Sequence, residues 1–266
     1  GESGDGQFIM MTGLLPLRDR RTVGEVVDNR LPAFPRLLRK KFHTAYSEIV
    51  IPSPPQMWMQ EKMNKAYGIE KMFCNQDAVS SHIQYLNDGQ LFTMAMNSDV
   101  CQLQPFFSMV LSYSTHQPYR EPVYNGLKLN TPMLTNADKN YLIACSYTDM
   151  WLHRYIDWLK QSGVFDNTLI VITADHHAHL DALGMGDKLK KELPLFIING
   201  NIDPVTAWKG EMNQLDIYTP LLDVLGIDND WHGLGHSVLL NSYSNSVDNK
   251  IWDLSEWIIM GDYFSK

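Results

Sequence analysis

The clearest hydrophobic pattern in the chain is an unbroken run at residues 168–173, reading Thr-Leu-Ile-Val-Ile-Thr. It ends in Ala174, Asp175, His176 and His177. Because no polar residue alternates with the apolar ones, the run predicts a strand buried on both faces, as in the centre of an α/β sheet. Ligands of such sheets gather at the carboxyl ends of the strands. The acid and the imidazoles are therefore predicted to lie at a functional edge.

Other apolar runs predict further strands. Residues 105–113 form a second buried-strand candidate that ends at Ser114, Thr115 and His116. Residues 43–51 and 193–198 read as shorter strands, the latter closed by Asn199 and Gly200. Three further strands are thus predicted besides the one that ends at Asp175.

Between these runs the apolar spacing is that of helices. The longest periodic stretch is 137–160, and shorter ones are 56–67, 79–86 and 215–225, the last with Pro220 inside it. Residues 23–41 read as a helix interrupted by Pro32 and Pro35. The Trp-rich tail at 251–264 is interpreted as an edge strand or hairpin.

This alternation predicts an α/β/α sandwich with a mixed, largely parallel central sheet. No internal repeat or low-complexity linker divides the sequence, so a single domain over residues 1–266 is expected. The first six residues carry no initiator Met and no leading strand, which favours a domain excised from a longer protein.

Composition narrows the function classes. The chain has 266 residues, 44% of them hydrophobic, and a net charge of −8. An acidic chain without a basic stripe disfavours nucleic-acid binding, and the basic cluster at 36–41 reads as a solvated helix face. No run approaches the 18 or more apolar residues of a membrane span, and no secretory leader is recognised. Three cysteines without CxxC spacing predict free thiols.

The candidate chemistry centres on Asp175 and His176. A carboxylate oxygen beside an imidazole nitrogen suits a divalent ion such as Zn²⁺ or Mn²⁺. The alternative is an Asp that caps a loop and a His that packs on the sheet edge. Ser3, in a Gly-rich start, and His116, after another strand, add a nucleophile and a polar contact. Together these residues would suit phosphoryl or sulfuryl ester chemistry, with the metal lowering the pKa of the nucleophilic hydroxyl.

The sequence also resembles a known family. Residues 166–176, DNTLIVITADH, are similar to the DNTxIVxxGDH segment of sulfatase-like enzymes in the alkaline phosphatase superfamily. Residues 105–119 resemble their PFF…SxHxPY segment. Residues 221–227 and 233–240 resemble their LLxxLGI…GxSLL pattern. These segments keep the family's order, and the resemblance implies the alkaline-phosphatase-like α/β/α fold.

Within that superfamily the closest resemblance is to the lipoteichoic acid synthase and phosphoglycerol transferase group. Residues 1–8, GESGDGQF, look like that group's nucleophile loop GKTSDxEF, with Ser3 at the position of the nucleophilic Thr. Residues 57–73 are similar to its FWNRxxxYxxxGYxxFF segment. The Cys/Ser-x-Pro-x-Arg signature of formylglycine sulfatases is absent from the sequence, which argues against sulfate-ester hydrolysis by the standard route.

The resemblance implies a role for each matching residue. Ser3 would attack phosphorus and become esterified, while Asp175, His176 and the Ser3 oxygen would hold one divalent ion, Mn²⁺ first and Mg²⁺, Ca²⁺ or Zn²⁺ as alternatives. His116 would contact the phosphate or assist the leaving group. Trp58 would line the substrate cleft, and His236 would contact the substrate. His177 and His179 are interpreted as a solvated rim or as residues that support the metal ligands, with direct metal binding as the alternative.

The resemblance further implies a metal-dependent phosphotransferase or phosphodiesterase that acts on glycerophosphate or phospholipid headgroup esters. Members of this group carry an N-terminal membrane anchor, so a catalytic domain on the extracytoplasmic side of the cell membrane is expected. The family's metal-binding Glu would precede Gly1, and its Arg after the cleft Trp is replaced by Gln60. These departures leave two alternatives open, a sulfatase or other ester hydrolase of the superfamily, and a degenerate binding domain without catalysis.

Overall fold

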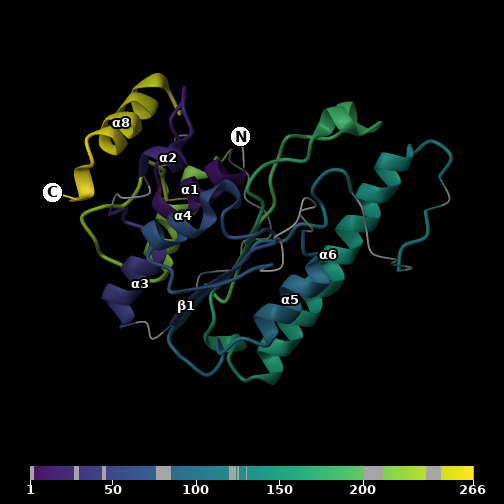
Figure 1. The fold of residues 1–266 in the computed structure, drawn as a ribbon, viewed down its shortest axis with the longest axis horizontal. Helices are drawn as coiled ribbons and strands as arrows, with labels where there is room; N and C mark the ends of the chain where they lie inside the picture. Colours follow the sequence, from purple (N-terminus) through teal and green to yellow (C-terminus); the bar gives the residue numbers. More distant parts are fainter. Residues whose placement is uncertain are drawn as a thin grey trace.

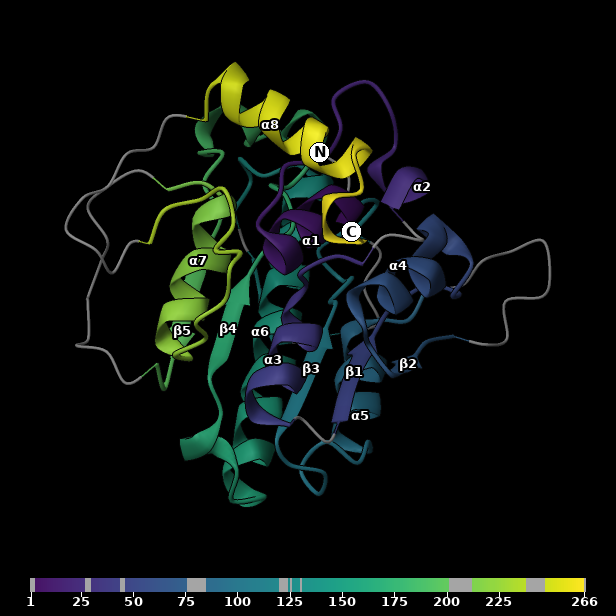
Figure 2. The same cartoon turned by 90° about the vertical axis from the view of Figure 1, so that its left-hand side faces the viewer.

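A parallel sheet and an antiparallel strand pair form the β structure (Figures 1 and 2). β1 (Tyr46–Val50) lies between β2 (Lys71–Phe73) and β3 (Phe106–Val110), and both neighbours run parallel to it. β4 (Ile170–Thr173) pairs antiparallel with β5 (Leu195–Ile198). This arrangement comes from a computed structural model that describes residues 3–26, 30–43, 46–75, 85–119, 124, 126–129, 131–200, 212–237 and 247–265.

Helices cover both faces of the β structure (Figure 1). One face carries α5 (Asp88–Met96) and the long α6 (Asn136–Gln161), and Val50 and Val110 pack against α5 there. Phe107 packs toward the opposite helical layer. That layer contains α1 (Ser3–Thr12), α2 (Thr22–Val26), α3 (Phe34–Phe42), α4 (Gln60–Tyr67), α7 (Leu215–Val224) and α8 (Asn249–Met260). Successive side chains of a strand point to opposite faces of the sheet and pack in two separate cores, which gives the predicted α/β/α layering.

Strands are confirmed at the predicted positions as β1, β3, β4 and β5, each within a few residues of its expected bounds. The full burial predicted for the runs at 105–113 and 168–173 is wrong, because β3 and β4 are only half-buried and β4 pairs with β5 alone among the described strands. The helices predicted at 137–160 and 215–225 are α6 and α7. The stretch 56–67 is α4 preceded by a 3₁₀ turn, η1 (Met57–Met59). Further 3₁₀ turns are η2 (Phe165–Asn167), η3 (Leu180–Ala182), η4 (Gly186–Lys188) and η5 (Tyr263–Ser265).

Two helix predictions need correction, and one helix, α5, was not predicted. The stretch 23–41 is two helices, and Pro35 sits in the first turn of α3, where its fixed φ helps to start the helix and does not interrupt it. For the helix predicted at 79–86, residues 79–84 lie outside the described residues, and Tyr85 and Leu86 are not helical. The next helix, α5, begins at Asp88 after the N-cap Asn87, whose side chain accepts from Gln90 N.

The tail was wrongly predicted as a strand or hairpin. It forms α8, which starts at the N-cap Asp248. Ser255, Ile258 and Ile259 recur at helical spacing and face the core, and the Ser255 hydroxyl donates to the carbonyl of Leu15 at 2.7 Å. Of the tryptophans that favoured a strand, Trp257 is exposed, and Trp252 donates its indole N–H to the carbonyl of Pro16.

The state of the cysteines and the character of the helices can be compared with what the sequence predicts. Cys74, Cys101 and Cys145 are free, as predicted. Among the described helices, none combines the length and the apolar character that a bilayer crossing needs.

Candidate active site

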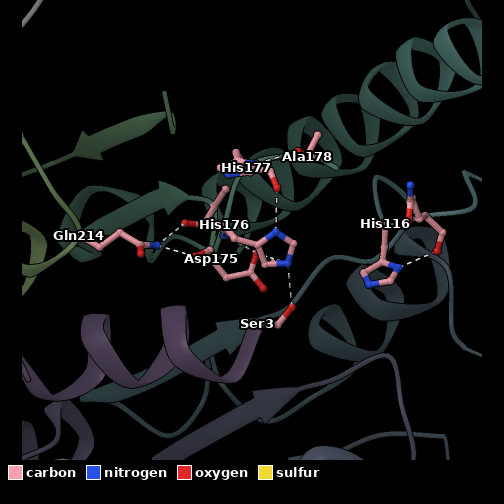
Figure 3. Close-up of polar contacts among 9 residues, drawn as sticks. Ser3, His116, Asp175, His176, His177, Ala178 and Gln214 are labelled. Carbon is pink, nitrogen blue, oxygen red and sulfur yellow. Dashed lines mark hydrogen bonds and ion pairs between the residues drawn. The ribbon is translucent and has the colours of Figure 1, made fainter. Parts of the chain in front are cut away.

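Ser3 and His176 meet although 173 positions separate them in the chain. Ser3 is the first residue of α1, and His176 follows the end of β4. The Ser3 Oγ lies 3.2 Å from the His176 Nε2 (Figure 3). The segment that was predicted as a nucleophile loop is helical from Ser3 onward, a correction that still leaves the hydroxyl beside the end of β4.

The His176 ring is oriented by its own loop. Its Nδ1 lies 2.8 Å from the carbonyl oxygen of His177. A carbonyl only accepts, so Nδ1 carries the proton, and Nε2 of the neutral ring keeps its lone pair. That lone pair faces the Ser3 hydroxyl, which makes Nε2 available to accept a proton or to bind a metal ion.

Asp175 adds a carboxylate to the same place. Its Oδ1 lies 3.9 Å from His176 Nε2, and it accepts the backbone N–H of His176 at 2.9 Å. The two side chains are 19% and 21% exposed, so solvent and substrate reach them only in part. Carboxylate, imidazole and hydroxyl form a donor set that fits a divalent ion. Among the described residues no group of three or more His, Cys, Asp or Glu is arranged to hold a metal ion, so the fit rests on these two ligands and Ser3.

His116 lies on a neighbouring loop, after β3 (Figure 3). Its Nδ1 donates to the carbonyl of Gln117 at 2.6 Å, by the same reasoning as for His176, and this directs Nε2 away from its own backbone. The His179 ring stands between the two loops, 6.3 Å from the His116 ring and 5.6 Å from the His176 ring, measured between centroids. A third imidazole, His179, therefore lies between His116 and His176, close enough to either for a supporting role or a place on the rim of the site, the roles that the sequence left open for it.

The loop that carries His116 is held by Asp88, a fully buried residue at the start of α5. Asp88 Oδ1 accepts the backbone N–H groups of Tyr113 at 2.7 Å and Ser114 at 3.0 Å. Asp88 Oδ2 accepts the Thr148 hydroxyl at 2.5 Å. Sequence analysis did not single out Asp88.

Trp58 is 41% exposed and ends a row of stacked rings. Its ring stacks on Tyr85 at 6.0 Å, Tyr85 stacks on Tyr113 at 4.5 Å, and Tyr113 stacks on His116 at 4.8 Å. Trp58 has φ of 50°, a left-handed conformation that is strained for a bulky residue. Burial raises the pKa of Tyr113 to about 12, so its hydroxyl stays neutral at physiological pH. The row connects Trp58 to His116, which the sequence did not predict.

Gln60 and His236 contact other parts of the structure. Gln60, at the position of the family's Arg, is buried, and its amide donates to Gln7 Oε1 on α1 at 3.4 Å. The His236 backbone N–H donates to Asp216 Oδ1 at 2.8 Å, and its Nδ1 lies 4.0 Å from the same oxygen. His236 therefore lies beside the first turn of α7, and its role as a substrate contact stays a prediction.

Two further residues, Gln214 and Gly6, lie against the backbone at Asp175. The side-chain amide of Gln214, next to α7, donates to the carbonyl oxygens of Ala174 at 3.2 Å and Asp175 at 2.6 Å (Figure 3). On α1, a Cβ added to Gly6 would lie 2.2 Å from the Asp175 carbonyl oxygen. No motif marked Gln214 or Gly6, because these contacts arise only in the folded chain.

The chain is similar to known proteins over most of its length. The profile of the Sulfatase family matches residues 4–227. Lipoteichoic acid synthase 2 of Bacillus subtilis (strain 168) is 23% identical over 275 residues, which cover 93% of this chain and 40% of that protein. Lipoteichoic acid synthase of Staphylococcus aureus (strain USA300) is 26% identical over 183 residues, covering 66% of this chain and 28% of that protein. The chain thus spans less than half the length of these relatives.

Solved structures share the fold. The lipoteichoic acid synthase LtaP from Listeria monocytogenes has a TM-score of 0.67 at 20% identity, over 86% of this chain and 61% of that chain. A protein in the alkaline phosphatase superfamily from Vibrio parahaemolyticus has a TM-score of 0.65 at 20% identity, over 86% of this chain and 56% of that chain. The Streptococcus pyogenes phosphoglycerol transferase GacH, in complex with sn-glycerol-1-phosphate, has a TM-score of 0.65 at 15% identity, over 99% of this chain and 72% of that chain. The predicted fold class is confirmed.

Because the profile covers most of its residues, the chain belongs to the sulfatase family, and its predicted resemblance to lipoteichoic acid synthases and phosphoglycerol transferases is confirmed.

Proposed function

We propose that this domain is a metal-dependent phosphotransferase or phosphodiesterase that works through a covalent intermediate on Ser3. The observation that carries the proposal is the 3.2 Å approach of the Ser3 hydroxyl to His176 Nε2, beside the Asp175 carboxylate. A hydroxyl at such a donor set is placed to become a nucleophile. The relatives named as lipoteichoic acid synthases and the glycerol-1-phosphate complex of GacH favour a glycerophosphate ester as the substrate.

The reaction would proceed in two displacements. In the first, Ser3 Oγ loses its proton to solvent and bonds to phosphorus, and the bond from phosphorus to the leaving oxygen breaks. His116 Nε2, when protonated, would give that oxygen its proton. In the second, a hydroxyl acceptor or water attacks the seryl phosphoester, the bond between phosphorus and Oγ breaks, and Ser3 is regenerated.

Asp175, His176 and the Ser3 oxygen would hold the metal ion. A bound divalent ion, Mn²⁺ by the resemblance, would lower the pKa of the Ser3 hydroxyl and offset the charge on the phosphoryl oxygens. The lone pair on His176 Nε2 is available for this role because Nδ1 is committed to the His177 carbonyl. The donor types also accommodate Mg²⁺, Ca²⁺ or Zn²⁺.

The remaining predicted residues would shape the substrate site. Trp58, exposed at the end of the ring row, would line the cleft for the part of the substrate that is not transferred. His236 would contact the substrate from beside α7. The resemblance also supports action on a phospholipid headgroup or another anionic ester, by one catalytic domain outside the cytoplasm at the cell membrane.

The test is the intact mass of the protein after incubation with Mn²⁺ and a glycerophosphodiester, followed by an acid quench. We expect a phosphoester adduct in the wild-type chain and in Ser3→Thr, which keeps a hydroxyl. We expect no adduct in Ser3→Ala. Ser162→Ala is the matched control, because Ser162 lies at the far cap of α6.

Each alternative predicts a different result. Turnover of a sulfate ester without turnover of the phosphodiester would identify a sulfatase. Bound Mn²⁺ with neither adduct nor turnover would favour the degenerate binding domain and contradict the proposal.

A further inference from the structure

The loop after β4 leaves the strand ladder at Thr173, so its next carbonyl groups need other partners. Gln214 supplies them for two consecutive residues. Its Nε2 donates to Ala174 O at 3.2 Å and to Asp175 O at 2.6 Å. One side-chain amide thereby fixes the two peptide planes from which the Asp175 and His176 side chains project.

The opposite side of the same backbone is held by α1. A Cβ on Gly6 would lie 2.2 Å from Asp175 O, 2.7 Å from its carbonyl carbon and 2.8 Å from its Cα. Backbone atoms cannot swing aside as a flexible side-chain end can, so any larger residue would move α1 and the loop apart. Ser3 lies one helical turn before Gly6, so the same displacement would carry the Ser3 hydroxyl away from His176.

We infer that Gln214 is a positioning residue that, together with Gly6, sets the distance between Ser3 and the Asp175–His176 pair. The inference rests on the proposed function of these three residues. Gln214, at the start of α7, donates a hydrogen bond to the Asp175 carbonyl, while Gly6 has no side chain and so lets α1 lie directly against that carbonyl. Neither residue touches a reacting atom, and both act through the position of Asp175.

The test measures binding of Mn²⁺ alone to chelator-treated protein by isothermal titration calorimetry, without substrate. Gln214→Met keeps the length and the neutral charge of the side chain but removes both donated hydrogen bonds. Loss of a group that orients metal ligands typically weakens metal affinity by about 10- to 100-fold. We expect Gln214→Met to raise the dissociation constant for Mn²⁺ by at least about tenfold.

Gln104→Met is the matched control. The Gln104 amide also donates to a backbone carbonyl, that of Cys101 at 3.1 Å, but on the loop before β3. We expect its Mn²⁺ affinity to equal that of the wild type. Gly6→Ala tests the same clamp from α1 and leaves Gln214 intact, so it decides the matter if Gln214→Met fails to fold.

The outcomes separate the inference from the proposed function. If the wild-type chain binds no divalent ion, the proposed function fails and the inference fails with it. If the wild type binds Mn²⁺ and Gln214→Met or Gly6→Ala binds it equally well, the clamp is refuted while the proposed function stands. Weaker binding in these variants, with Gln104→Met unchanged, supports the clamp.

Discussion

Asp88 offers the sharpest test of how the His116 loop is held. The residue is fully buried, and its carboxylate accepts two backbone N–H groups, from Tyr113 and Ser114, and the Thr148 hydroxyl. Asp88→Ala removes the acceptor and leaves two N–H groups without a partner, that of Ser114 buried and that of Tyr113 partly buried. The Thr148 hydroxyl is less affected, because it also lies 3.1 Å from the carbonyl of Ala144.

The expected loss follows from these contacts. An unsatisfied buried donor costs about 1–3 kcal/mol, so two N–H groups predict a loss of about 3 kcal/mol in the free energy of unfolding. For a domain of this size that corresponds to a fall of about 6–12 °C in Tm. Asp88→Asn keeps an oxygen for both N–H groups, and its new amide faces a hydroxyl that can accept, so we expect a loss of only about 1 kcal/mol.

The measurement is thermal and urea unfolding of the two variants beside the wild-type chain. Asp88→Asn is the matched control, because it keeps the size of the side chain and the acceptor toward the loop. Equal losses in the two variants would mean that charge, and not the acceptor, matters at this position. A loss below about 1 kcal/mol in Asp88→Ala would refute the argument that the loop depends on these hydrogen bonds.

Three further outcomes are expected. Tyr113→Phe keeps the ring stacked on His116 and should retain kcat, whereas Tyr113→Ala should lower kcat by up to about 100-fold through misplacement of the imidazole; equal kinetics in the two variants would contradict this role. The pKa of Asp138 is lowered, because hydrogen bonds from Thr135 and Met185 outweigh the raising effect of burial. The stabilisation that the Asp138 carboxylate provides is therefore present above the ordinary carboxyl pKa and is lost as pH falls through the lowered value. The loss of Tm in Asp138→Asn should be larger at pH 7 than at pH 3, and an equal loss at both pH values would contradict this role of the carboxylate. Removal of a bound divalent ion by chelation should lower Tm, by the equivalent of about 2.7 kcal/mol at an ion concentration 100 times its Kd, and an unchanged Tm would argue against metal binding.

The positions of Asp175, His176 and His116 after the ends of β4 and β3 were predictable because their signals are local. The apolar run before Asp175 indicates a buried strand, and general rules for α/β sheets place ligands at its carboxyl end. His116 follows by the same reasoning from the run at 105–113. The proximity of Ser3 is different, because 173 positions separate it from His176 and no local pattern encodes that distance. Only the family resemblance connected the two.

The elements that were missed had signals that compete. The sequence Asn87-Asp88-Gly89-Gln90 contains a capping box, but Asp-Gly also indicates a turn, and no helix was predicted over residues 88–96. Gly89 is helical because α6 packs on it, with Tyr147 Oη only 2.5 Å from where a Cβ would be. Gly6 in α1 has the same kind of cause, the approach of the Asp175 backbone. In both helices a tertiary contact selects glycine against its low helix propensity.

Asp88 and Gln214 hold the two site loops for the same physical reason. Where β3 and β4 end, the backbone leaves the ladder, and its N–H and C=O groups must find partners elsewhere. Asp88 accepts the N–H groups after β3, and Gln214 donates to the C=O groups after β4. A carboxylate cannot donate and two carbonyls cannot accept from it, so the two residues are not interchangeable. Whether a hydrogen-bond acceptor or a donor is required beside each loop is therefore set by which backbone groups the strand end exposes, independently of the chemistry that the loop goes on to support.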